Sequence, residues 1–142
     1  MNKFFIILFI IFFNQVVFAT PKIPIEIVAI KDGDTIRAKL ENGNKFDIRL
    51  YGIDCYESKK IHRAYKQAYT EKTSIENIIE RGLLAKHYLE NENKKSKTIS
   101  FSFMGVDIYK RTLGILYFDN ININNSLVEK KFCKSYLYSE KF

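Results

Sequence analysis

Cysteine and histidine are scarce in this chain, with two of each among its 142 residues. Neither Cys55 nor Cys133 has a partner at the short spacing that thiolate and imidazole metal sites show, which argues against a site of that kind. His62 lies in a charged stretch and His87 within a predicted helix, where solvent or packing roles are usual. The composition therefore directs the search for a functional site to other side chains.

The sequence also has no apolar run long enough to span a membrane. The run at 4–13 ends at the polar pair 14–15, well short of the roughly 20 residues that a spanning helix needs. Lys3 precedes the run, and Val17-Phe18-Ala19 has the small-x-small form of a cleavage site. We expect residues 1–19 to be a secretory signal peptide rather than an anchor, and the protein to be exported, periplasmic or extracellular, without stable membrane association after cleavage.

Internal repeats and long low-complexity tracts are absent as well, and residues 20–142 suit one domain with one modest core. All residues of a site must then come from this domain, which we expect to be a monomer. The net charge is +7, or +6 once Lys3 is removed with the leader. A basic surface attracts polyanions such as nucleic acids, but it also serves solubility alone, so charge leaves both readings open.

Alternating apolar residues predict half-buried strands near 25–27, 36–40 and 46–50, the last two joined by a hairpin through Glu41-Asn42-Gly43-Asn44. On the third strand, Arg49 then lies on the face opposite the apolar residues, where it is able to meet a ligand. Two further strands are predicted at 99–103 and 113–118.

Two helices are predicted. Thr73-Ser74-Ile75-Glu76 has the form of a capping box, and apolar residues at helical spacing continue to about Glu90. Gly82 inside this helix implies close packing or a bend, because glycine costs about 1 kcal/mol relative to alanine there. A polar loop at 91–97 follows, and a short second helix is expected at about 125–131.

Three ordered strings carry the chemistry: KDGDTIRAKL from Lys31, DIRLYGIDCYE from Asp47 and DIYKRTLGILY from Asp107. Carboxylates able to hold a hard cation, a further carboxylate able to activate water, and two guanidiniums able to neutralise a phosphate are what phosphodiester cleavage needs. Together these strings resemble the staphylococcal nuclease (thermonuclease) family, from about Ile25 to about Tyr138.

The resemblance implies a mainly β (α+β) fold, a five-stranded OB-type barrel with one longer and one short helix. It also implies a Ca²⁺-dependent endonuclease that acts on DNA and RNA with little sequence preference and leaves 3′-phosphate ends. A non-catalytic nucleic-acid-binding module and a secreted structural or adhesion protein are the alternatives.

The resemblance assigns the calcium ligands to the carboxylates of Asp34 and Asp54 and the backbone carbonyl of Cys55. Asp32 would orient ligands or waters. Glu57 matches the glutamate that acts on the attacking water, either as general base or by positioning it. Oxygen-only ligation is what a hard cation prefers.

Arg49 and Arg111 match the arginines that contact the scissile phosphate. Tyr109 matches a tyrosine that contacts the terminal phosphate, and Tyr136 or Tyr138 would supply a base-stacking ring. In the family, the segments that hold Cys55 and Cys133 lie near each other, so a disulfide is plausible, with two buried thiols as the alternative.

This chain departs from the family pattern at several positions. Tyr56 replaces a proline before the glutamate, which frees the backbone there. Lys110 and Lys131 stand where the family has glycine, the latter at a helix end that needs a left-handed residue. The segment 58–81 is longer than the family usually has.

Overall fold

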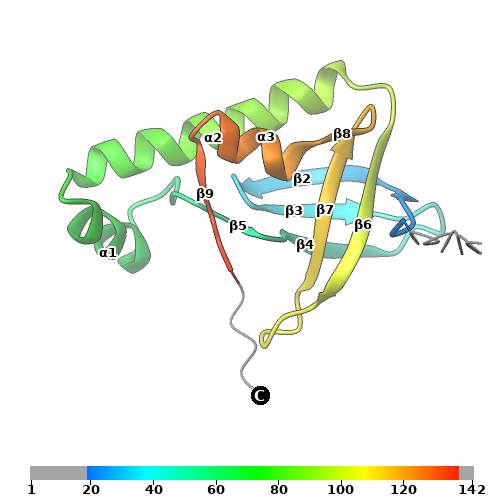
Figure 1. The fold of residues 1–142 in the computed structure, drawn as a ribbon, viewed down its shortest axis with the longest axis horizontal. Helices are drawn as coiled ribbons and strands as arrows, with labels where there is room; N and C mark the ends of the chain where they lie inside the picture. Colours follow the sequence, from blue (N-terminus) through cyan, green and yellow to red (C-terminus); the bar gives the residue numbers. More distant parts are fainter. Residues whose placement is uncertain (1–18, 138–142) are drawn as a thin grey trace, which may run out of the picture.

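The structure is a computed structural model that describes residues 19–137, and it is a single α+β domain (Figure 1). The predicted signal peptide lies outside the described residues except for Ala19. The elements in chain order are β1 Ile23–Pro24, β2 Glu26–Asp32, β3 Thr35–Lys39, β4 Lys45–Leu50, β5 Ile53–Cys55, α1 His62–Glu71, α2 Ile75–Lys95, β6 Ile99–Val106, β7 Thr112–Phe118, β8 Ile121–Asn122, α3 Ile123–Glu129 and β9 Cys133–Ser135.

The main sheet has the strand order β1-β6-β7-β4-β3-β2, with β8 paired to β7. It is mixed, because β4 and β7 run parallel while the other pairs are antiparallel. The chain passes from β1 to β2 through Ile25, whose N–H donates to the carbonyl of Ile99 at 3.1 Å. The α+β prediction is confirmed, but within residues 19–137 no β2–β6 ladder closes the sheet into the barrel that the resemblance implied.

The predicted hairpin is β3–β4, in register from Thr35 opposite Arg49 to Lys39 opposite Lys45. Gly43 adopts a φ of +87° in its turn, a conformation that glycine adopts without strain. The strand parity also holds, because Ile48 and Leu50 are fully buried in the core while Arg49 faces carboxylates on the other side. A second sheet, β5–β9, carries Cys55 opposite Cys133.

Helix α2 is longer than predicted and begins one residue later than the capping box implied. Ser74 is the N-cap, and its side chain accepts from the N–H of Asn77 at 3.1 Å. The predicted loop at 91–97 is wrong for its first part, since α2 continues to Lys95 and ends where Ser96 bonds back to the Glu92 carbonyl. Lysines in the last turn favour this extension, because they complement the negative end of the helix.

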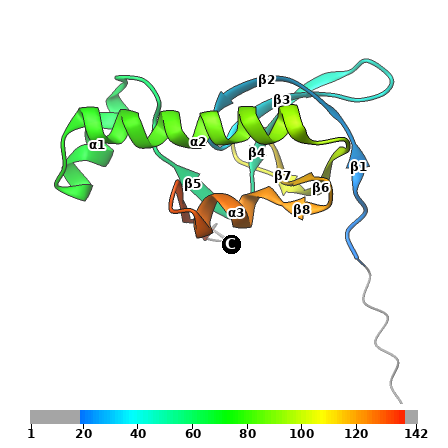
Figure 2. The ribbon, with the colours of Figure 1, turned by 90° about the horizontal axis from the view of Figure 1, so that it is seen from above.

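Helix α1 is the one helix of residues 19–137 that we did not predict, and the short strands β1, β5, β8 and β9 were not predicted either. The helix packs beside the first turns of α2, at the end of the molecule away from the main sheet (Figures 1 and 2). Its buried residues are only Ala64 and Ala68, which pack with Tyr56 and Ile78. No side chain caps its N-terminus. The segment therefore lacks a start signal, and because its buried residues are small it also lacks a stripe of large apolar residues.

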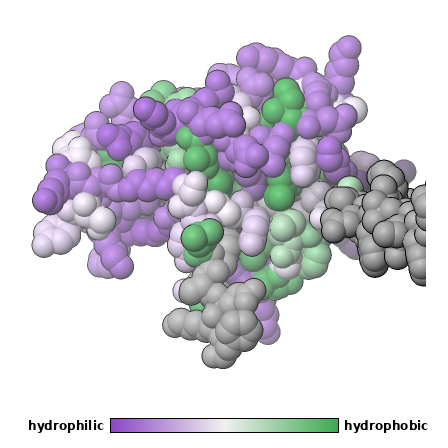
Figure 3. All heavy atoms as spheres, viewed as in Figure 1, coloured by the Kyte–Doolittle hydropathy of each residue, from purple (hydrophilic) through white to green (hydrophobic). Residues whose placement is uncertain are grey.

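Helix α3 begins two residues before the prediction, capped by the side chain of Asn122. After it, Lys131 adopts a φ of +61°, the left-handed conformation for which the family uses glycine. Asn124 is buried and links three segments: its side chain accepts from the N–H of Leu116 and donates to the carbonyls of Tyr51 and Gly114. Hydrophilic side chains cover most of the face over α1 and α2 (Figure 3).

Gly82 is required by close packing, as its place inside α2 predicted. A Cβ there would lie 2.3 Å from the carbonyl oxygen of Glu57 and 2.7 Å from the N–H nitrogen of Ser58. Gly33, in the β2–β3 turn, is also closely packed: its φ is not positive, and a Cβ would lie 2.6 Å from the Cβ of Ala85. Helix α2 therefore presses directly on the segments that carry Asp34 and Glu57.

We expect Gly82→Ala to lower the thermal midpoint, and with it the phosphodiester cleavage that the resemblance implies. The added methyl group forces the Glu57 backbone away, at a cost of about 1–3 kcal/mol that exceeds the gain of about 1 kcal/mol in helix propensity. Asn91→Ala, on an exposed turn of the same helix, is the control and leaves stability equal or slightly higher. A Gly82→Ala protein as stable as wild type would contradict the close-packing role.

Candidate active site

A cleft of about 770 Å³ brings together side chains from β4, β5, α1, the β6–β7 turn and the C-terminal segment. The polar residues that border it are Arg49, Tyr51, Asp54, Arg63, Asp107, Tyr109, Arg111 and Tyr136. Both predicted arginines and one predicted metal ligand therefore lie along one concavity.

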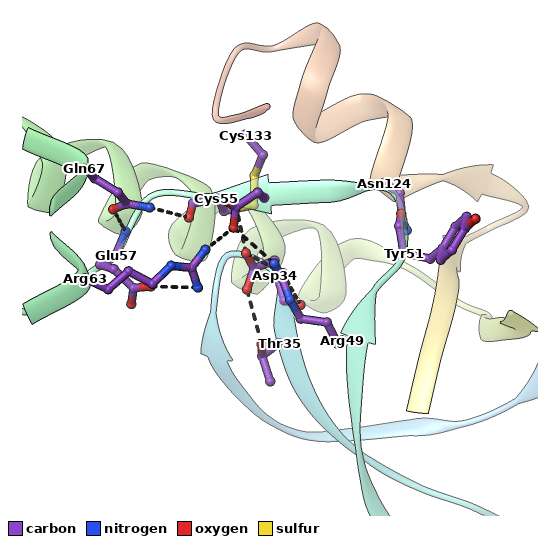
Figure 4. The surroundings of a disulfide bond; sticks show 11 residues. Asp34, Thr35, Arg49, Tyr51, Cys55, Glu57, Arg63, Gln67, Asn124 and Cys133 are labelled. Atoms are coloured by element: carbon purple, nitrogen blue, oxygen red, sulfur yellow. Dashed lines mark hydrogen bonds and ion pairs between the residues drawn. A yellow bond between two sulfur atoms is a disulfide. The ribbon is translucent and has the colours of Figure 1, made fainter. Parts of the chain in front are cut away.

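Asp34 and Arg49 form a buried ion pair at the inner end of this cleft, with only 9% and 7% of their side chains exposed. Asp34 follows Gly33 at the β2–β3 turn, and its Oδ2 accepts from the N–H of Cys55 at 2.8 Å while its Oδ1 accepts from the Thr35 hydroxyl at 3.2 Å. Burial raises the pKa of the Asp34 carboxyl, and the Arg49 guanidinium and the Cys55 N–H oppose that rise. These contacts fix the carboxylate in one orientation (Figure 4).

Asp54 lies between two arginines. Its Oδ1 is 3.1 Å from Nη2 of Arg49 and also pairs with Nη2 of Arg63. The other terminal nitrogen of Arg63, Nη1, lies 3.2 Å from Oε1 of Glu57. The Arg63 guanidinium thus bridges the two carboxylates, and Figure 4 shows its contact with Glu57.

Glu57 borders a neighbouring hollow with Asp32 and Lys31 rather than the main cleft, and its ion pair with Arg63 connects it to that cleft. Burial is the main cause that raises the pKa of its carboxyl, and the carboxylates Asp32, Asp34 and Asp54 add to the rise while Arg63 opposes it. Four acidic groups therefore act on one another here, and a carboxylate with a raised pKa accepts a proton more readily than an ordinary glutamate.

Cys55 links the site to the rest of the fold. It forms a disulfide with Cys133, so β9 is fixed to the strand that carries Asp54. Its carbonyl, the third oxygen that the resemblance assigned to a metal, accepts from Nε2 of Gln67 at 3.3 Å. Oε1 of the same glutamine accepts from the N–H of Glu57 at 3.0 Å, so one side chain of α1 holds both backbone groups.

The segment between Cys55 and Glu57 is held firmly although it lacks the family's proline. Tyr56 is 7% exposed, and its hydroxyl accepts from Nη1 of Arg81 at 3.3 Å. The Arg81 guanidinium also lies over the Tyr56 ring, 5.2 Å from its centroid. Side-chain packing therefore replaces the backbone restriction that proline would provide.

Arg111 is held by Asp107 in the β6–β7 turn. Asp107 Oδ2 accepts from Nε of Arg111 at 2.7 Å, and Oδ1 accepts from the N–H groups of Tyr109 and Arg111, both at 2.9 Å. Lys110 adopts a φ of +61°, which explains the family's glycine at this position. Arg111 borders the cleft with Nε engaged and 40% of its side chain exposed, so a ligand there would be able to meet its terminal nitrogens.

We expect Asp107→Asn to lower the stability, with a pH signature, and to lower the rate of the phosphodiester cleavage that the resemblance implies. Burial acts to raise the pKa of Asp107, but the N–H and guanidinium of Arg111 outweigh it and hold that pKa below the usual 3.8. A carboxyl whose pKa is depressed by folding stabilises the protein above its unfolded pKa and loses that contribution as pH falls through the folded value. The deficit in thermal midpoint is therefore constant near neutral pH and shrinks below about pH 4.

Asp119→Asn is the matched control for this variant. Asp119 also accepts two backbone N–H bonds, from Lys97 and Thr98 at 2.9 Å, but it lies outside the residues that border the cleft. The Asp119→Asn protein should be less stable than wild type and equally active. A deficit for Asp107→Asn that grows toward low pH would contradict the assigned role of the carboxylate.

Of the remaining predicted residues, some border the cleft and others do not. Asp32 accepts from the Ser58 hydroxyl at 3.2 Å, beside Glu57 rather than beside Asp34. Tyr109 and Tyr136 border the cleft and are 73% and 45% exposed. Tyr138 lies outside the described residues. Neither His62 nor His87 borders the cleft, and both are exposed.

The donor set suits a hard cation, although the side chains are not arranged as a finished cage. Asp34, Asp54 and the Cys55 carbonyl offer only oxygen, and no thiolate or imidazole lies among them. In residues 19–137, however, no three acidic, histidine or cysteine side chains converge as a metal cluster. The carboxylates pair instead with Arg49 and Arg63.

These features define an α+β domain whose basic cleft, bordered by carboxylates, is suited to a phosphodiester. The family model described as staphylococcal nuclease homologue matches residues 47–141, so the chain belongs to that family. The family resemblance of the sequence is thereby confirmed, and membership indicates nuclease-type phosphodiester hydrolysis with nucleic acid as substrate. The match includes Arg49, Asp54, Glu57 and Arg111 but begins after Asp34. A search of curated proteins gives no match.

Proposed function

We propose that this protein is an exported, Ca²⁺-dependent endonuclease that hydrolyses DNA and RNA with little sequence preference and leaves 3′-phosphate ends. The observation that carries the proposal is that Arg49, Asp54 and Arg111 border one cleft, with Asp34 and Glu57 joined to it through direct ion pairs. Family membership supports the reaction class.

Substrate binding rests on two guanidiniums and two aromatic rings. Arg49 and Arg111 offer planar, bidentate donors to a phosphate that gains negative charge as it is attacked. Tyr109 and Tyr136 offer ring faces for bases, and stacking on such faces accepts every base. Recognition of phosphates and ring faces without base-edge contacts gives little sequence preference.

Asp34, Asp54 and the Cys55 carbonyl would hold Ca²⁺. When bound, the cation would neutralise phosphate charge beside the two arginines. Glu57 would accept the proton of the attacking water or hold that water in place, and its raised pKa suits the first role. Asp107 positions Arg111 through two backbone bonds and one guanidinium bond.

Export is supported by the Cys55–Cys133 disulfide, because such bonds persist in oxidising compartments. Among the described residues, no helix has the length and apolar content needed to span a bilayer. Secretion through a leader at residues 1–19 remains the prediction made from the sequence.

A second candidate is a nucleic-acid-binding module with weak or no catalysis. It is favoured by one observation: the carboxylates assigned to the metal are already paired with Arg49 and Arg63. Salt-sensitive DNA binding without turnover would support it.

The test uses residues 20–142, purified with the disulfide oxidised, and incubates single- and double-stranded DNA and RNA with Ca²⁺ or with chelator. Cleavage with Ca²⁺ alone is expected. The product ends should block extension by a polymerase until a phosphatase removes the 3′-phosphate. DNA and RNA both uncut in Ca²⁺ would sink the proposal.

A further inference from the structure

Arg63 is the most consequential side chain that neither the sequence motifs nor the proposed mechanism uses. It lies on α1, in the segment that is longer than the family usually has, and 47% of its side chain is exposed. Its guanidinium bridges Asp54 and Glu57. Nη1 lies 3.2 Å from Oε1 of Glu57, the contact that Figure 4 shows. One cation from the chain itself therefore joins two carboxylates to which the proposed function gives active roles.

The charges around this contact show what the bridge does. Asp34, Asp54 and Glu57 contribute three negative charges, and Arg49 pairs with the first two. Among residues 19–137, Glu57 forms its ion pair with Arg63. Without Arg63, three carboxylates face a single guanidinium, that of Arg49. The more negative site attracts a divalent cation more strongly, because calcium affinity rises with the charge of its surroundings.

Arg49 and Arg63 differ in how readily each can move away from the carboxylates that it pairs with. Arg49 is 7% exposed and bonds Asp34 through both its carboxylate and its backbone carbonyl. Arg63 extends from the exposed side of α1 into the open cleft, and its flexible stem allows it to turn away without disturbing the core. The ion pair between Arg63 and Asp54 is therefore the one that a cation can replace.

We propose that Arg63 competes with the divalent cation for Asp54 and, while it is bound there, also occupies Glu57, so that the cation must displace its guanidinium before the site is active. This inference rests on the proposed function. It makes Arg63 a positioning residue that sets the calcium requirement of the enzyme.

The test is calcium binding by titration calorimetry, with Ca²⁺ alone as the probe and the oxidised protein of residues 20–142. Arg63→Ala is expected to bind Ca²⁺ on the order of tenfold more tightly than wild type, since one competing charge is gone. Arg63→Gln, which keeps most of the side-chain volume, should behave in the same way and guards against a folding defect. Lys66→Ala removes a charge from the same helix and should change the dissociation constant by less than about twofold, because it is solvent-exposed.

Thermal melts give a second readout that a structural role would not move in this direction. Calcium raises the midpoint through its binding free energy, so the rise on adding Ca²⁺ should be larger for Arg63→Ala than for wild type. If Arg63 were merely structural, Arg63→Ala would lower the midpoint with and without Ca²⁺. The affinity of the variant for Ca²⁺ would then be equal to that of wild type or weaker.

The outcomes separate the two claims. Equal or weaker calcium binding by both Arg63 variants, with normal binding by wild type, overturns this inference and leaves the proposed function standing. Failure of wild type and both variants to bind Ca²⁺ removes the calcium role and the inference together.

Discussion

Glu57→Gln lowers kcat for DNA hydrolysis by about 100- to 10,000-fold, the range that a positioned general base contributes. The amide keeps the shape of the side chain, and the Glu57 N–H still donates to Gln67, so the backbone stays in place. What the variant loses is the charge that accepts a proton and pairs with Arg63. DNA affinity should change little, because the phosphate contacts are assigned to Arg49 and Arg111.

The measurement is kcat and KM at saturating Ca²⁺, together with DNA binding across a range of salt concentrations. Glu76→Gln is the control: this exposed carboxylate pairs with Lys60 on the outer side of α2 and borders a different hollow, so its loss should leave kcat unchanged. A Glu57→Gln enzyme that retains a tenth or more of the wild-type kcat would show that Glu57 neither takes the proton nor positions the water.

Removal of the disulfide by Cys55→Ala with Cys133→Ala should reduce the free energy of unfolding by about 3–4 kcal/mol. The two cysteines are 78 residues apart, so the bond constrains a long loop of the unfolded chain. It also fixes β9 to β5, the strand that carries Asp54 and whose Cys55 N–H donates to Asp34. We therefore expect the variant to bind Ca²⁺ more weakly, so that its activity needs a higher Ca²⁺ concentration, alongside the loss of stability.

Denaturant unfolding of the double variant, of oxidised wild type and of wild type in reductant measures this effect. Reductant should destabilise wild type to about the level of the double variant and leave the double variant unchanged, which controls for the loss of the two sulfur atoms. A difference below about 1 kcal/mol between the oxidised protein and the variant would mean that β9 and the core hold the site without the bond.

Short-range sequence patterns were enough to predict the β3–β4 hairpin, the side of the strand on which Arg49 lies and the position of a special glycine. The β3–β4 hairpin follows from alternating apolar residues around Gly43, and the same parity placed Arg49 away from the core. Gly82 was expected to mark either close packing or a bend, and the carbonyl of Glu57 lies against it. In each case the signal is a short-range requirement of the backbone.

Long-range contacts account for what the sequence did not predict. Helix α1 buries mainly Ala64 and Ala68, so its stability comes from packing against Tyr56 and α2 rather than from a strong local pattern. Arg63 and Gln67, which contact the site residues, went unnoticed because they lie on that helix. No motif marks a residue whose role depends on where an inserted helix docks.

Asp107 was within reach of sequence reasoning. It stands four residues before Arg111 in the DIYKR string, and an aspartate at the start of a tight turn commonly accepts backbone N–H bonds. Asn124 had no comparable signal, since its three partners come from other segments of the chain.

The most direct test of the central claim is DNA cleavage by residues 20–142 in Ca²⁺ and in chelator, with Glu57→Gln and Arg111→Ala beside the wild type. The account predicts calcium-dependent cleavage by wild type that is lost in chelator and falls at least 100-fold in both variants. Calcium-dependent cleavage that survives both substitutions would contradict the assigned site, and retained salt-sensitive binding without any cleavage would show a binding module instead of an enzyme.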